Sequence, residues 1–371
     1  MESHRRLLEE AGYPVVVLSG RGAGVVIPEL DSRHPEVEAI TQRLAAGDVP
    51  VERFEKLRER VAERLDEVLA GADLVLAHNV LTMHFNLPLA AALAGRRVLA
   101  WTHDLAWTNP RYIDFQRDGF PYDILHRPAP GARYVAISAR VRGQLLTTYG
   151  VPAEVVPNGV DRLALLRIRP STRELLAGAG LLDAAPLVFT PVRVTRRKRL
   201  ELALEAVVRL AARLPGLKLV VSGPLGPHSA DSQAYWSELA DLRRRLGLES
   251  RVVFLHELGP PHPVDDEMVA ELYQLAAAVL LTSESEGFGL PVLEAGLTRV
   301  PVVCADLDVF REVAAGLAWT YPPEAGPEAV AAALEAALGT NTAQLQQRAA
   351  EGHDWRHILP RIEREIELAL A

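Results

Sequence analysis

The chain alternates short apolar runs with longer segments in which apolar residues recur every three or four positions. Short unbroken apolar runs are typical of parallel strands covered on both faces, and the helical segments between them supply the crossovers. We therefore predict an α/β protein built from two doubly wound parallel sheets. The predicted strands are residues 14–19, 24–30, 74–79, 97–103, 133–138 and 153–160, followed by 187–192, 218–223, 251–257, 278–283, 300–306 and 318–322.

Strand character is lost between these two sets of runs. Pro170 and a turn at Gly178 and Gly180 punctuate the segment, which marks it as a hinge between domains. At 371 residues the chain is long enough for two hydrophobic cores. The predicted parts are a first domain over 1–160, a hinge over 161–186, a second domain over 187–350, and an amphipathic helix over 354–371 that packs back on the first domain.

The composition, 49% apolar and 24% charged, is that of a soluble globular protein, and no apolar run is long enough to span a bilayer. The first six residues are too polar for a secretion signal, and the single Cys304 excludes an internal disulfide. A net charge of −8 argues against a general nucleic-acid binder. These features predict a cytoplasmic enzyme with no nucleic-acid partner and no transmembrane segment.

Two glutamates flank a glycine-containing turn after one of the predicted strands. Glu286 lies in the turn, and Glu294 lies on the helix that Pro291 begins. Gly287 and Gly289 let the backbone approach a ligand, and a helix start favours an anion. Since a carboxylate accepts two hydrogen bonds from a vicinal diol, the turn could hold both phosphate and sugar. The alternative is a helix start with ordinary surface glutamates.

A basic run follows the first strand of the second half. Arg193 and Lys198 stand five positions apart beside the strand end, and two cations in that place form a clamp for a diphosphate leaving group. For Arg196, Arg197 and Arg199 the alternatives are a solvated helix start or a nucleic-acid patch. We favour solvation for these three.

Polar and aromatic residues also follow two strands of the first half. His103, Asp104 and Trp107 form a cluster suited to an acceptor or donor-sugar hydroxyl, although a histidine after a strand is often only a packing or capping residue. Asn79 and its neighbour His78 could line the same wall, but Asn79 could equally cap the next helix. Ligands bind outside the carboxyl ends of strands in open parallel sheets, so we expect these groups to gather there.

Two further patterns favour structural roles. Asp306 and Asp308 match a metal-binding pattern, but their place before a helix predicts that they cap it. No His or Cys cluster with metal spacing occurs elsewhere, so we expect no metal. The glycine-rich segment from Gly20 to Gly24 lacks the helix that a dinucleotide fingerprint requires, which predicts a hairpin-like turn.

Taken together, these motifs and their order resemble the family 4 glycosyltransferases, which have the GT-B fold of two Rossmann-like domains facing a cleft. The resemblance spans nearly the whole chain, and the combination is specific although each piece alone is weak. It rests on Val156 to Asp161 (VPNGVD), Arg193 with Lys198, Ser222-Gly223-Pro224, the glutamate pair around Gly287-Phe288-Gly289, His103, and Asp354-Trp355.

The resemblance implies a retaining hexosyltransferase that moves a sugar from a UDP- or GDP-sugar to a hydroxyl acceptor, without a metal or other cofactor. The Glu286 position meets the donor sugar, the Glu294 position meets the ribose diol, and the His103 position lies near the transferred sugar. The Arg193 and Lys198 positions bind the diphosphate. The other donor-side positions are Gly287, Phe288, Gly289, Leu290, Gly223 and Asn158, and those on the acceptor side are Asn79, Asp104 and Trp107.

The front of the chain departs from the family pattern. Residues 5–12 resemble the end of the family's first helix and 14–19 its second strand, so the first strand and its glycine-rich loop are absent. We expect that loss to leave a gap in the sheet with unpaired backbone groups on either side. A late start codon, a shortened chain and a rebuilt domain are the competing explanations, and we favour the first two.

Two other functions remain open at this point. A catalytically silent nucleotide-sugar-binding protein would fit the incomplete front of the chain. A GT-B-fold sugar-nucleotide epimerase would share the architecture but not the glutamate motif with its arginine–lysine clamp.

Overall fold

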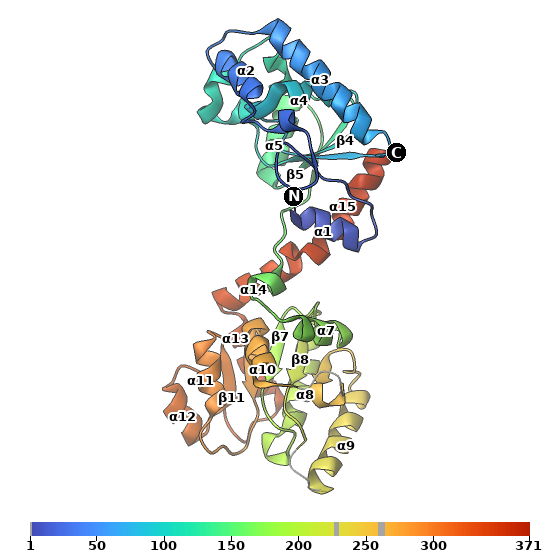
Figure 1. Cartoon of the computed structure of the whole chain (residues 1–371). Helices are drawn as coiled ribbons and strands as arrows, with labels where there is room; N and C mark the ends of the chain where they lie inside the picture. The colour runs from blue at the N-terminus through green and yellow to red at the C-terminus, as the bar shows by residue number, and fades with distance from the viewer. Residues whose placement is uncertain (1, 226–229, 259–263) are drawn as a thin grey trace. The chain divides into compact units, whose positions relative to one another are not determined.

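The computed structural model describes residues 2–225, 230–258 and 264–371 (Figure 1). The chain forms two compact units. Unit 1 comprises Met1–Gly159 together with Trp355–Ala371, and unit 2 comprises Val160–Asp354. Each unit contains a parallel sheet with its own helices.

The sheet of unit 2 is doubly wound, as predicted. All its strands are parallel, in the order β12-β11-β10-β7-β8-β9, so the strand order reverses between β7 and β10. Such a reversal opens a crevice at the carboxyl ends of the two strands, where ligands of this fold bind. The strands are β7 (Leu187–Thr190), β8 (Lys218–Val221), β9 (Val252–Phe254), β10 (Ala278–Leu281), β11 (Val302–Ala305) and β12 (Trp319–Tyr321).

Helices cover the sheet of unit 2 and explain its apolar runs. Every residue of β7, β10 and β11 is buried, because a strand covered on both faces has no solvent side. The helices are α6 (Arg162–Leu165), α7 (Pro170–Gly178), α8 (Leu200–Ala211), α9 (Ala230–Arg245), α10 (Asp266–Leu275), α11 (Leu290–Leu297), α12 (Asp308–Ala314), α13 (Pro327–Leu338) and α14 (Asn341–His353), with 3-10 turns η6 (Arg196–Lys198) and η7 (Leu255–Glu257).

The main sheet of unit 1 has the order β3-β4-β5-β6 and is also parallel. Along β4, Val98 and Ala100 belong to one core cluster, while Leu99 and Trp101 belong to another on the opposite face. The elements are α1 (Glu2–Glu10), η1 (Pro28–Leu30), α2 (Pro35–Ala45), α3 (Val51–Leu69), β3 (Val75–His78), η2 (His84–Asn86), α4 (Leu87–Ala92), β4 (Val98–Thr102), η3 (Ala106–Thr108), η4 (Pro110–Phe115), η5 (Tyr122–Leu125), β5 (Ala132–Ala136), α5 (Ala139–Tyr149), β6 (Glu154–Val155) and α15 (Trp355–Leu370).

The structure corrects two predictions for the front of the chain. The order β3-β4-β5-β6 is continuous, so this sheet contains no internal gap. Instead, β3 forms one edge and pairs only with β4 among the described residues. The predicted gap assumed that the first strands would join this sheet, whereas β1 (Leu18–Ser19) and β2 (Val25–Val26) form a small sheet of their own.

The connection between β1 and β2 is not a hairpin-like turn, because the two strands are parallel. The Val25 amide donates to the Val17 carbonyl at 2.8 Å, and the Ile27 amide to the Ser19 carbonyl at 2.9 Å. Gly24 has a φ of +90°, and a Cβ there would lie 2.3 Å from the Val17 carbonyl oxygen. Glycine therefore lets the loop turn back far enough to place the second strand alongside the first in the same direction.

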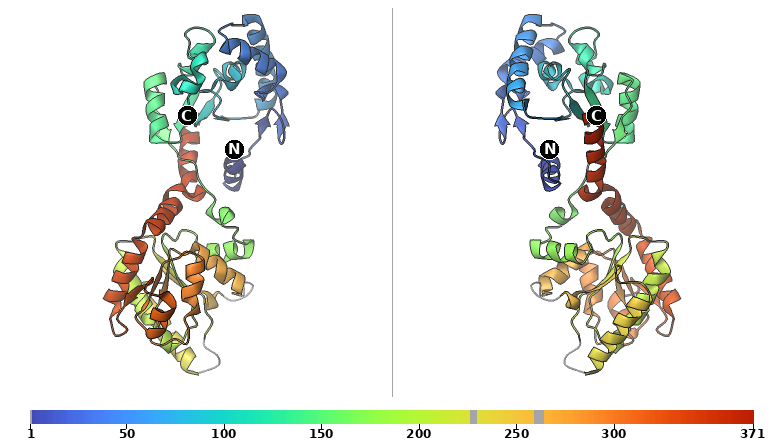
Figure 2. Two further views of the ribbon diagram at one scale, coloured as in Figure 1. Left: turned by 90° about the vertical axis from the view of Figure 1, so that its left-hand side faces the viewer. Right: turned by 90° about the vertical axis from the view of Figure 1, so that its right-hand side faces the viewer.

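The helix α15 lies against the strands of unit 1 (Figure 2). Ile358, Ile362 and Ile366 are buried in the same cluster as Leu99 and Trp101. One ion pair fixes the helix to β5: the Arg133 Nε atom lies 2.7 Å from the Glu365 Oε2 atom, where the Glu365 side chain is 2% exposed and that of Arg133 is 37% exposed. The buried member of this pair is thus the carboxylate.

Because only the carboxylate is buried, we predict that removing Arg133 destabilises unit 1 more than removing the charge of Glu365. Arg133→Met leaves a buried, unpaired carboxylate and should cost about 3 kcal/mol of unit 1 stability. Glu365→Gln leaves a guanidinium that can still reach water and should cost about 1 kcal/mol. Hydrogen exchange of the β4 and β5 amides reports on unit 1 alone. Lys56→Met, which breaks the exposed Lys56–Glu52 pair, is the control. Equal losses of stability in Arg133→Met and Glu365→Gln would contradict the conclusion that the carboxylate is the buried partner.

Candidate functional site

The loops after β7 and β10 meet at the point where the strand order of unit 2 reverses. The Glu284 amide donates to the Arg197 carbonyl at 2.9 Å, and the Thr282 hydroxyl donates to the Lys198 carbonyl at 2.7 Å. Thr282 is buried, so this second bond is shielded from water. The backbone that presents the two predicted groups of ligand-binding residues is therefore held together before any ligand binds.

The side chains of Lys198 and Glu286 form an ion pair within these loops. The Lys198 Nζ atom contacts the Glu286 Oε1 atom, and the two side chains are only 8% and 11% exposed. The Ser283 hydroxyl donates to the same oxygen at 2.9 Å, and Arg197 Nη1 lies 3.8 Å from the other. The structure thus brings together two residues that the sequence predicts as ligand contacts, and it adds Ser283 and Arg197 as neighbours.

Glu294 lies on α11 with an exposed side chain and a fixed orientation. The Tyr273 hydroxyl on α10 donates to its Oε2 atom at 2.6 Å. Burial, and then the bond to Glu294, raise the pKa of Tyr273, so the phenol stays a donor at neutral pH. Sequence reasoning missed Tyr273, because nothing in the spacing of a helical tyrosine indicates a partner 21 positions later.

The turn before α11 depends on one of its two glycines. Gly289 has a φ of +91°, and a Cβ there would lie 3.1 Å from the Phe310 ring. A Cβ on Gly287 would meet open space, so that position carries no steric requirement. Leu290 begins α11, and the first N–H groups of a helix have no partner within it. The predicted loop of Gly287, Phe288, Gly289 and Leu290 therefore offers backbone donors beside the ion pair.

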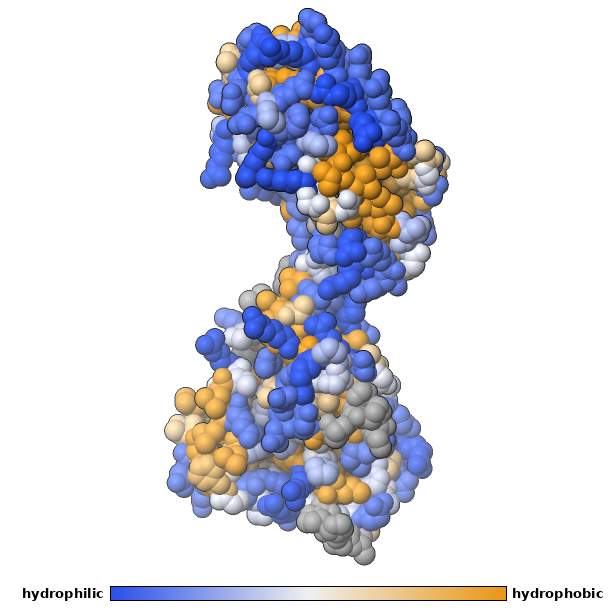
Figure 3. Space-filling model, in the orientation of Figure 1, coloured by the Kyte–Doolittle hydropathy of each residue, from blue (hydrophilic) through white to orange (hydrophobic). Residues whose placement is uncertain are grey.

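Apolar side chains border this turn. Figure 3 shows that they gather on the surface over α11 and α12. The exposed large apolar residues there are Phe288, Leu290, Leu293, Leu297 and Leu317. An anion bound at the first turn of α11 would lie next to apolar surface, where its electrostatic interactions are screened less than in bulk water.

Arg193 is positioned by a close approach of two loops. A Cβ on Gly223 would lie 2.1 Å from the Val192 carbonyl oxygen and 2.6 Å from the Arg193 Cα atom, so only glycine fits there. The Val194 amide donates to the Pro224 carbonyl at 3.0 Å and fixes the same contact. The Arg193 side chain is exposed and pairs with no carboxylate among the described residues, which leaves its charge available to an anion.

The other arginines of the basic run are engaged rather than simply solvated. Arg196 pairs with Asp231 and Glu238 on α9, and its guanidinium carbon lies 5.2 Å from the centre of the Tyr235 ring. Arg199 donates to the Pro323 carbonyl at 2.6 Å. Arg196 thus stays exposed to solvent, as expected, while it pairs with carboxylates far away in the sequence, and Arg199 bonds a backbone carbonyl.

In unit 1, Asn79 connects the ends of two strands. Its Oδ1 atom accepts from the amides of His103 and Asp104, both at 3.1 Å. Asn79 has a φ of +55°. The alternative role as a helix cap is therefore wrong, and Asn79 instead orders the loop that carries His103 and Asp104.

A group of histidines lies beside this loop, of which His4 is buried and His78 and His103 are half-buried. The His4 Nδ1 and His78 Nε2 atoms are 3.2 Å apart, and the His78 ring lies 6.1 Å from that of His103. Burial lowers the pKa of His4 to about 4, that of His78 to about 3, and that of His103 below its usual value. All three rings are therefore neutral at pH 7, which leaves them able to donate or accept a hydrogen bond.

The predicted cluster of His103, Asp104 and Trp107 is only partly assembled. The Asp104 carboxylate accepts from the Asn109 side chain at 3.1 Å. Trp107 instead stacks on His126, with ring centres 4.0 Å apart. Asn158, the remaining predicted position, is exposed near the end of the first segment of unit 1.

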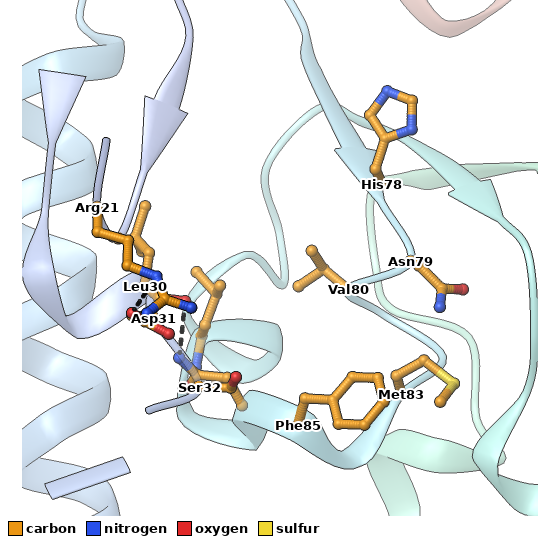
Figure 4. Close-up of a pocket in the computed structure, with 12 residues that line it drawn as sticks. Arg21, Leu30, Asp31, Ser32, His78, Asn79, Val80, Met83 and Phe85 are labelled. Carbon is orange, nitrogen blue, oxygen red and sulfur yellow. Dashed lines mark hydrogen bonds and ion pairs between the residues drawn. The ribbon is translucent and has the colours of Figure 1, made fainter. Parts of the chain in front are cut away.

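A pocket of about 320 Å³ opens at the carboxyl end of β3 in unit 1 (Figure 4). One wall comes from the loops around β1 and β2, and the other from the segment after β3. It is lined by Gly20, Arg21, Leu30, Asp31, Ser32, His78, Asn79, Val80, Met83, Phe85, Asn86 and Leu89. Of the predicted acceptor-side residues, Asn79 is the one that lines it.

Asp306 and Asp308 do not cap the helix that follows them. The N-cap of α12 is Leu307, and Asp306 and Asp308 instead each bond Arg311 at 2.7 Å, so the predicted capping role was wrong. No group of three or more His, Cys, Asp or Glu side chains in ranges 2–225, 230–258 and 264–371 is arranged to hold a metal ion. Within the same ranges, each helix is too short or too polar to cross a bilayer.

Comparisons with known proteins agree with this architecture. The family profile described as "Glycosyltransferase Family 4" matches residues 2–162, and the one described as "Glycosyl transferases group 1" matches residues 173–352. Two α/β units with parallel sheets, matched in turn by these profiles, define a protein of the GT-B class. The chain belongs to the family 4 glycosyltransferases.

Individual relatives match different shares of the chain. The D-inositol 3-phosphate glycosyltransferase of Nocardia farcinica is 34% identical over an alignment of 200 residues, and the match covers 51% of this chain and 42% of that protein. The mannosylglucosylglycerate synthase of Thermotoga maritima is 23% identical over an alignment of 345 residues, and the match covers 84% of this chain and 77% of that protein. The Anabaena protein HepE, solved with UDP, matches with 20% identity and a TM-score of 0.39, covering 84% of this chain and 82% of that one. The chain thus spans less than half of the first of these relatives.

The buried pair in unit 2 predicts strong energetic coupling. Lys198→Met and Glu286→Gln each leave one polar partner buried, and each should cost about 3 kcal/mol. The double variant should cost at least about 1 kcal/mol less than the sum. Hydrogen exchange of the β7 and β10 amides measures the effect on unit 2. The exposed Arg209–Glu328 pair is the matched control, where the stability losses of the two single variants should add up in the double variant. Additive losses at Lys198 and Glu286 would contradict a buried ion pair between them.

The neutral histidines predict a pH dependence of unit 1. Unfolded histidines take up protons near pH 6.5, whereas folded His4 and His78 do so only near pH 4 and 3. Stability should therefore be full above pH 6.5 and fall as the pH drops, by up to about 1.4 kcal/mol per pH unit for each group. His4→Phe should show a shallower loss between pH 7 and pH 5 in hydrogen exchange of the β4 amides. Leu7→Ala, which weakens the same helix without removing a titrating group, should keep the wild-type slope.

Proposed function

We propose that the protein is a glycosyltransferase that moves a sugar from a nucleoside diphosphate sugar to a hydroxyl acceptor, with retention of configuration. The observation that supports this most is the buried contact between Lys198 and Glu286 where the strand order of unit 2 reverses. A cation for phosphate and a carboxylate for hydroxyls stand side by side at the place where this fold binds nucleotides.

The donor would extend along this edge of the sheet. Glu294 would accept hydrogen bonds from the ribose diol, in the orientation that Tyr273 holds. Glu286 would accept from hydroxyls of the transferred sugar. The diphosphate would lie between Arg193 and the start of α11, where the Leu290 N–H group and the helix dipole favour an anion.

Donor binding would change the hydrogen-bond partners of Lys198 and Glu286. Without a donor, Glu286 neutralises Lys198. With a donor, the Lys198 ammonium would turn part of its hydrogen bonding to a phosphate oxygen while Glu286 bonds the sugar, so neither charge is left unpaired. The two groups are thus kept in place by each other until the ligand supplies its own partners.

The chemical step would break the bond between the anomeric carbon and the phosphate oxygen. The acceptor oxygen would attack the same face, and its proton would pass to an oxygen of the departing phosphate. Negative charge grows on that phosphate in the transition state, where Arg193, Lys198 and the start of α11 would stabilise it. These groups supply the positive charge for a metal-independent reaction.

The acceptor side would lie in unit 1. His103 is neutral and half-buried beside the ordered loop after β4, which suits a hydrogen bond to a sugar or acceptor hydroxyl. Asn79 and Asp104 would order the same loop, and Trp107 would border it. For the donor we propose a UDP- or GDP-hexose, in keeping with the names of the two relatives, a glycosyltransferase and a mannosylglucosylglycerate synthase.

One observation favours a second candidate. In the sheet of unit 1 the strands follow one another in chain order, whereas the strand order of unit 2 reverses. The carboxyl ends of the unit 1 strands therefore lack the crevice that such a reversal opens. A nucleotide-sugar-binding protein without transferase activity would need only unit 2. Release of nucleoside diphosphate from a panel of UDP-, GDP- and ADP-sugars distinguishes the two candidates, and donor binding without any release across a panel of hydroxyl acceptors would overturn the transferase.

Substitutions should separate binding from turnover. Glu294→Gln should raise the donor half-saturation concentration about tenfold, because it weakens charged hydrogen bonds to the ribose. Arg193→Ala and Lys198→Ala should mainly lower kcat, by about a hundredfold or more, because the charge they stabilise develops in the transition state.

The matched control is Arg213→Ala, since Arg213 forms an exposed pair with Glu335 on the surface of unit 2. Steady-state kinetics of nucleoside diphosphate release should be unaltered by this change. If Glu294, Arg193 and Lys198 variants all behave like the control, the donor site lies elsewhere.

A further inference from the structure

The pocket at the carboxyl end of β3 combines features that suit one class of acceptor. Its volume of about 320 Å³ is at the small end of the range for ligand pockets, ~300–1,000 Å³. Polar groups from two loops far apart in the sequence converge on it, together with one aromatic ring (Figure 4). The donor residues of unit 2 take no part in it.

One polar wall carries paired charges. Arg21 Nε lies 3.1 Å from Asp31 Oδ2, and the side chains are 64% and 17% exposed. The other Asp31 oxygen accepts from the Arg33 amide at 2.9 Å. A guanidinium that donates and a carboxylate that accepts, side by side, can bind neighbouring hydroxyls of one molecule.

The opposite wall adds neutral polar groups. Asn79 uses its Oδ1 atom for the amides of His103 and Asp104, and its Nδ2 group makes no hydrogen bond within the described part of the chain. His78, which also lines the pocket, is neutral because burial lowers its pKa to about 3.

The charges of the lining residues therefore cancel. Arg21 is the single cation of the lining and Asp31 the single anion, and they are already paired. A carboxylate or phosphate acceptor would have to compete with Asp31 for Arg21 and would lie beside a carboxylate. A neutral polyhydroxyl compound meets both groups without that repulsion.

The apolar surface of the pocket includes an exposed ring. Phe85 is 43% exposed and lines the pocket together with Leu30, Val80 and Met83. Its ring is fixed by His84 and Tyr112, whose centres lie 4.6 and 6.1 Å away. The C–H groups on one face of a pyranose ring can pack on such a ring while its hydroxyls point to the polar walls.

We propose that this pocket binds the acceptor as a neutral sugar ring, stacked on Phe85 and hydrogen-bonded by Arg21 and Asp31. The inference rests on the proposed transferase function and narrows its acceptor to a saccharide hydroxyl. The product is then a glycoside with one more sugar unit, formed by the bond exchange described above.

The first test compares acceptors. Nucleoside diphosphate release from the best donor of the panel is measured with methyl α-D-glucopyranoside and methyl α-D-mannopyranoside, and with D-glycerate and myo-inositol 1-phosphate. The neutral glycosides should stimulate release at least tenfold more than either anion. Stimulation by the anions alone would overturn the inference and leave the transferase function intact.

The second test uses variants of the pocket. Phe85→Ala should raise the half-saturation concentration for the glycoside at least tenfold more than that for the donor, and Phe85→Trp should restore most of the loss. Phe120→Ala is the matched control, because Phe120 is similarly exposed, contacts Phe54 and is not part of the pocket. Equal effects of Phe85→Ala and Phe120→Ala would exclude the stacking role.

A third variant tests whether the Arg21–Asp31 pair selects neutral acceptors. Asp31→Asn leaves Arg21 without its paired charge, so the ratio of release with anionic acceptors to release with neutral glycosides should rise about tenfold. No shift would contradict the proposed role of the ion pair.

Calorimetric binding of the methyl glycosides separates the two proposals. Absence of release from every donor, with glycoside binding that Phe85→Ala abolishes, overturns the transferase but supports the pocket. Release without calorimetric glycoside binding overturns the pocket alone.

Discussion

The ion pair between Lys198 and Glu286 is the constraint on which the donor half of the protein depends. Each charge is almost buried, so each requires the other, and together they hold the loops after β7 and β10 against one another. The reversal of strand order makes this possible, because it leaves two adjacent strands whose connections depart in opposite directions. The ion pair thus lies where the two loops leave adjacent strands of unit 2. Unit 1 has no equivalent reversal, and its polar loops are ordered by the amide of Asn79 instead.

The strands could be predicted from the sequence because their burial is unusually complete. In β7 and β10 every residue is apolar or a buried threonine, and such runs are recognisable without any knowledge of their partners. The glutamates, Arg193 and Lys198 could be proposed for a similar reason, since they directly follow such runs. Their roles stay proposals, whereas the contact between Lys198 and Glu286 is a property of the fold.

What could not be predicted depends on contacts between distant segments. Tyr273 orients Glu294, and Asp231 and Glu238 bind Arg196, but no local pattern connects these residues. The pocket of unit 1 has the same origin, because its walls come from the irregular segment around Arg21 and from the short 3-10 helix that carries Phe85. The parallel pairing of β1 and β2 was missed because a glycine-rich connection of that length usually joins antiparallel strands.

The attachment of α15 to unit 1 has a consequence for the order in which the protein is made. Residues 355–371 leave the ribosome only after all of unit 2 has been synthesised, yet they cover one face of the β4 and β5 strands. Until then, Leu99, Trp101 and Val135 lack the apolar cover that Ile358, Ile362 and Ile366 provide. The unit that begins the chain therefore completes its core last, and a nascent chain exposes that face throughout translation of the second unit.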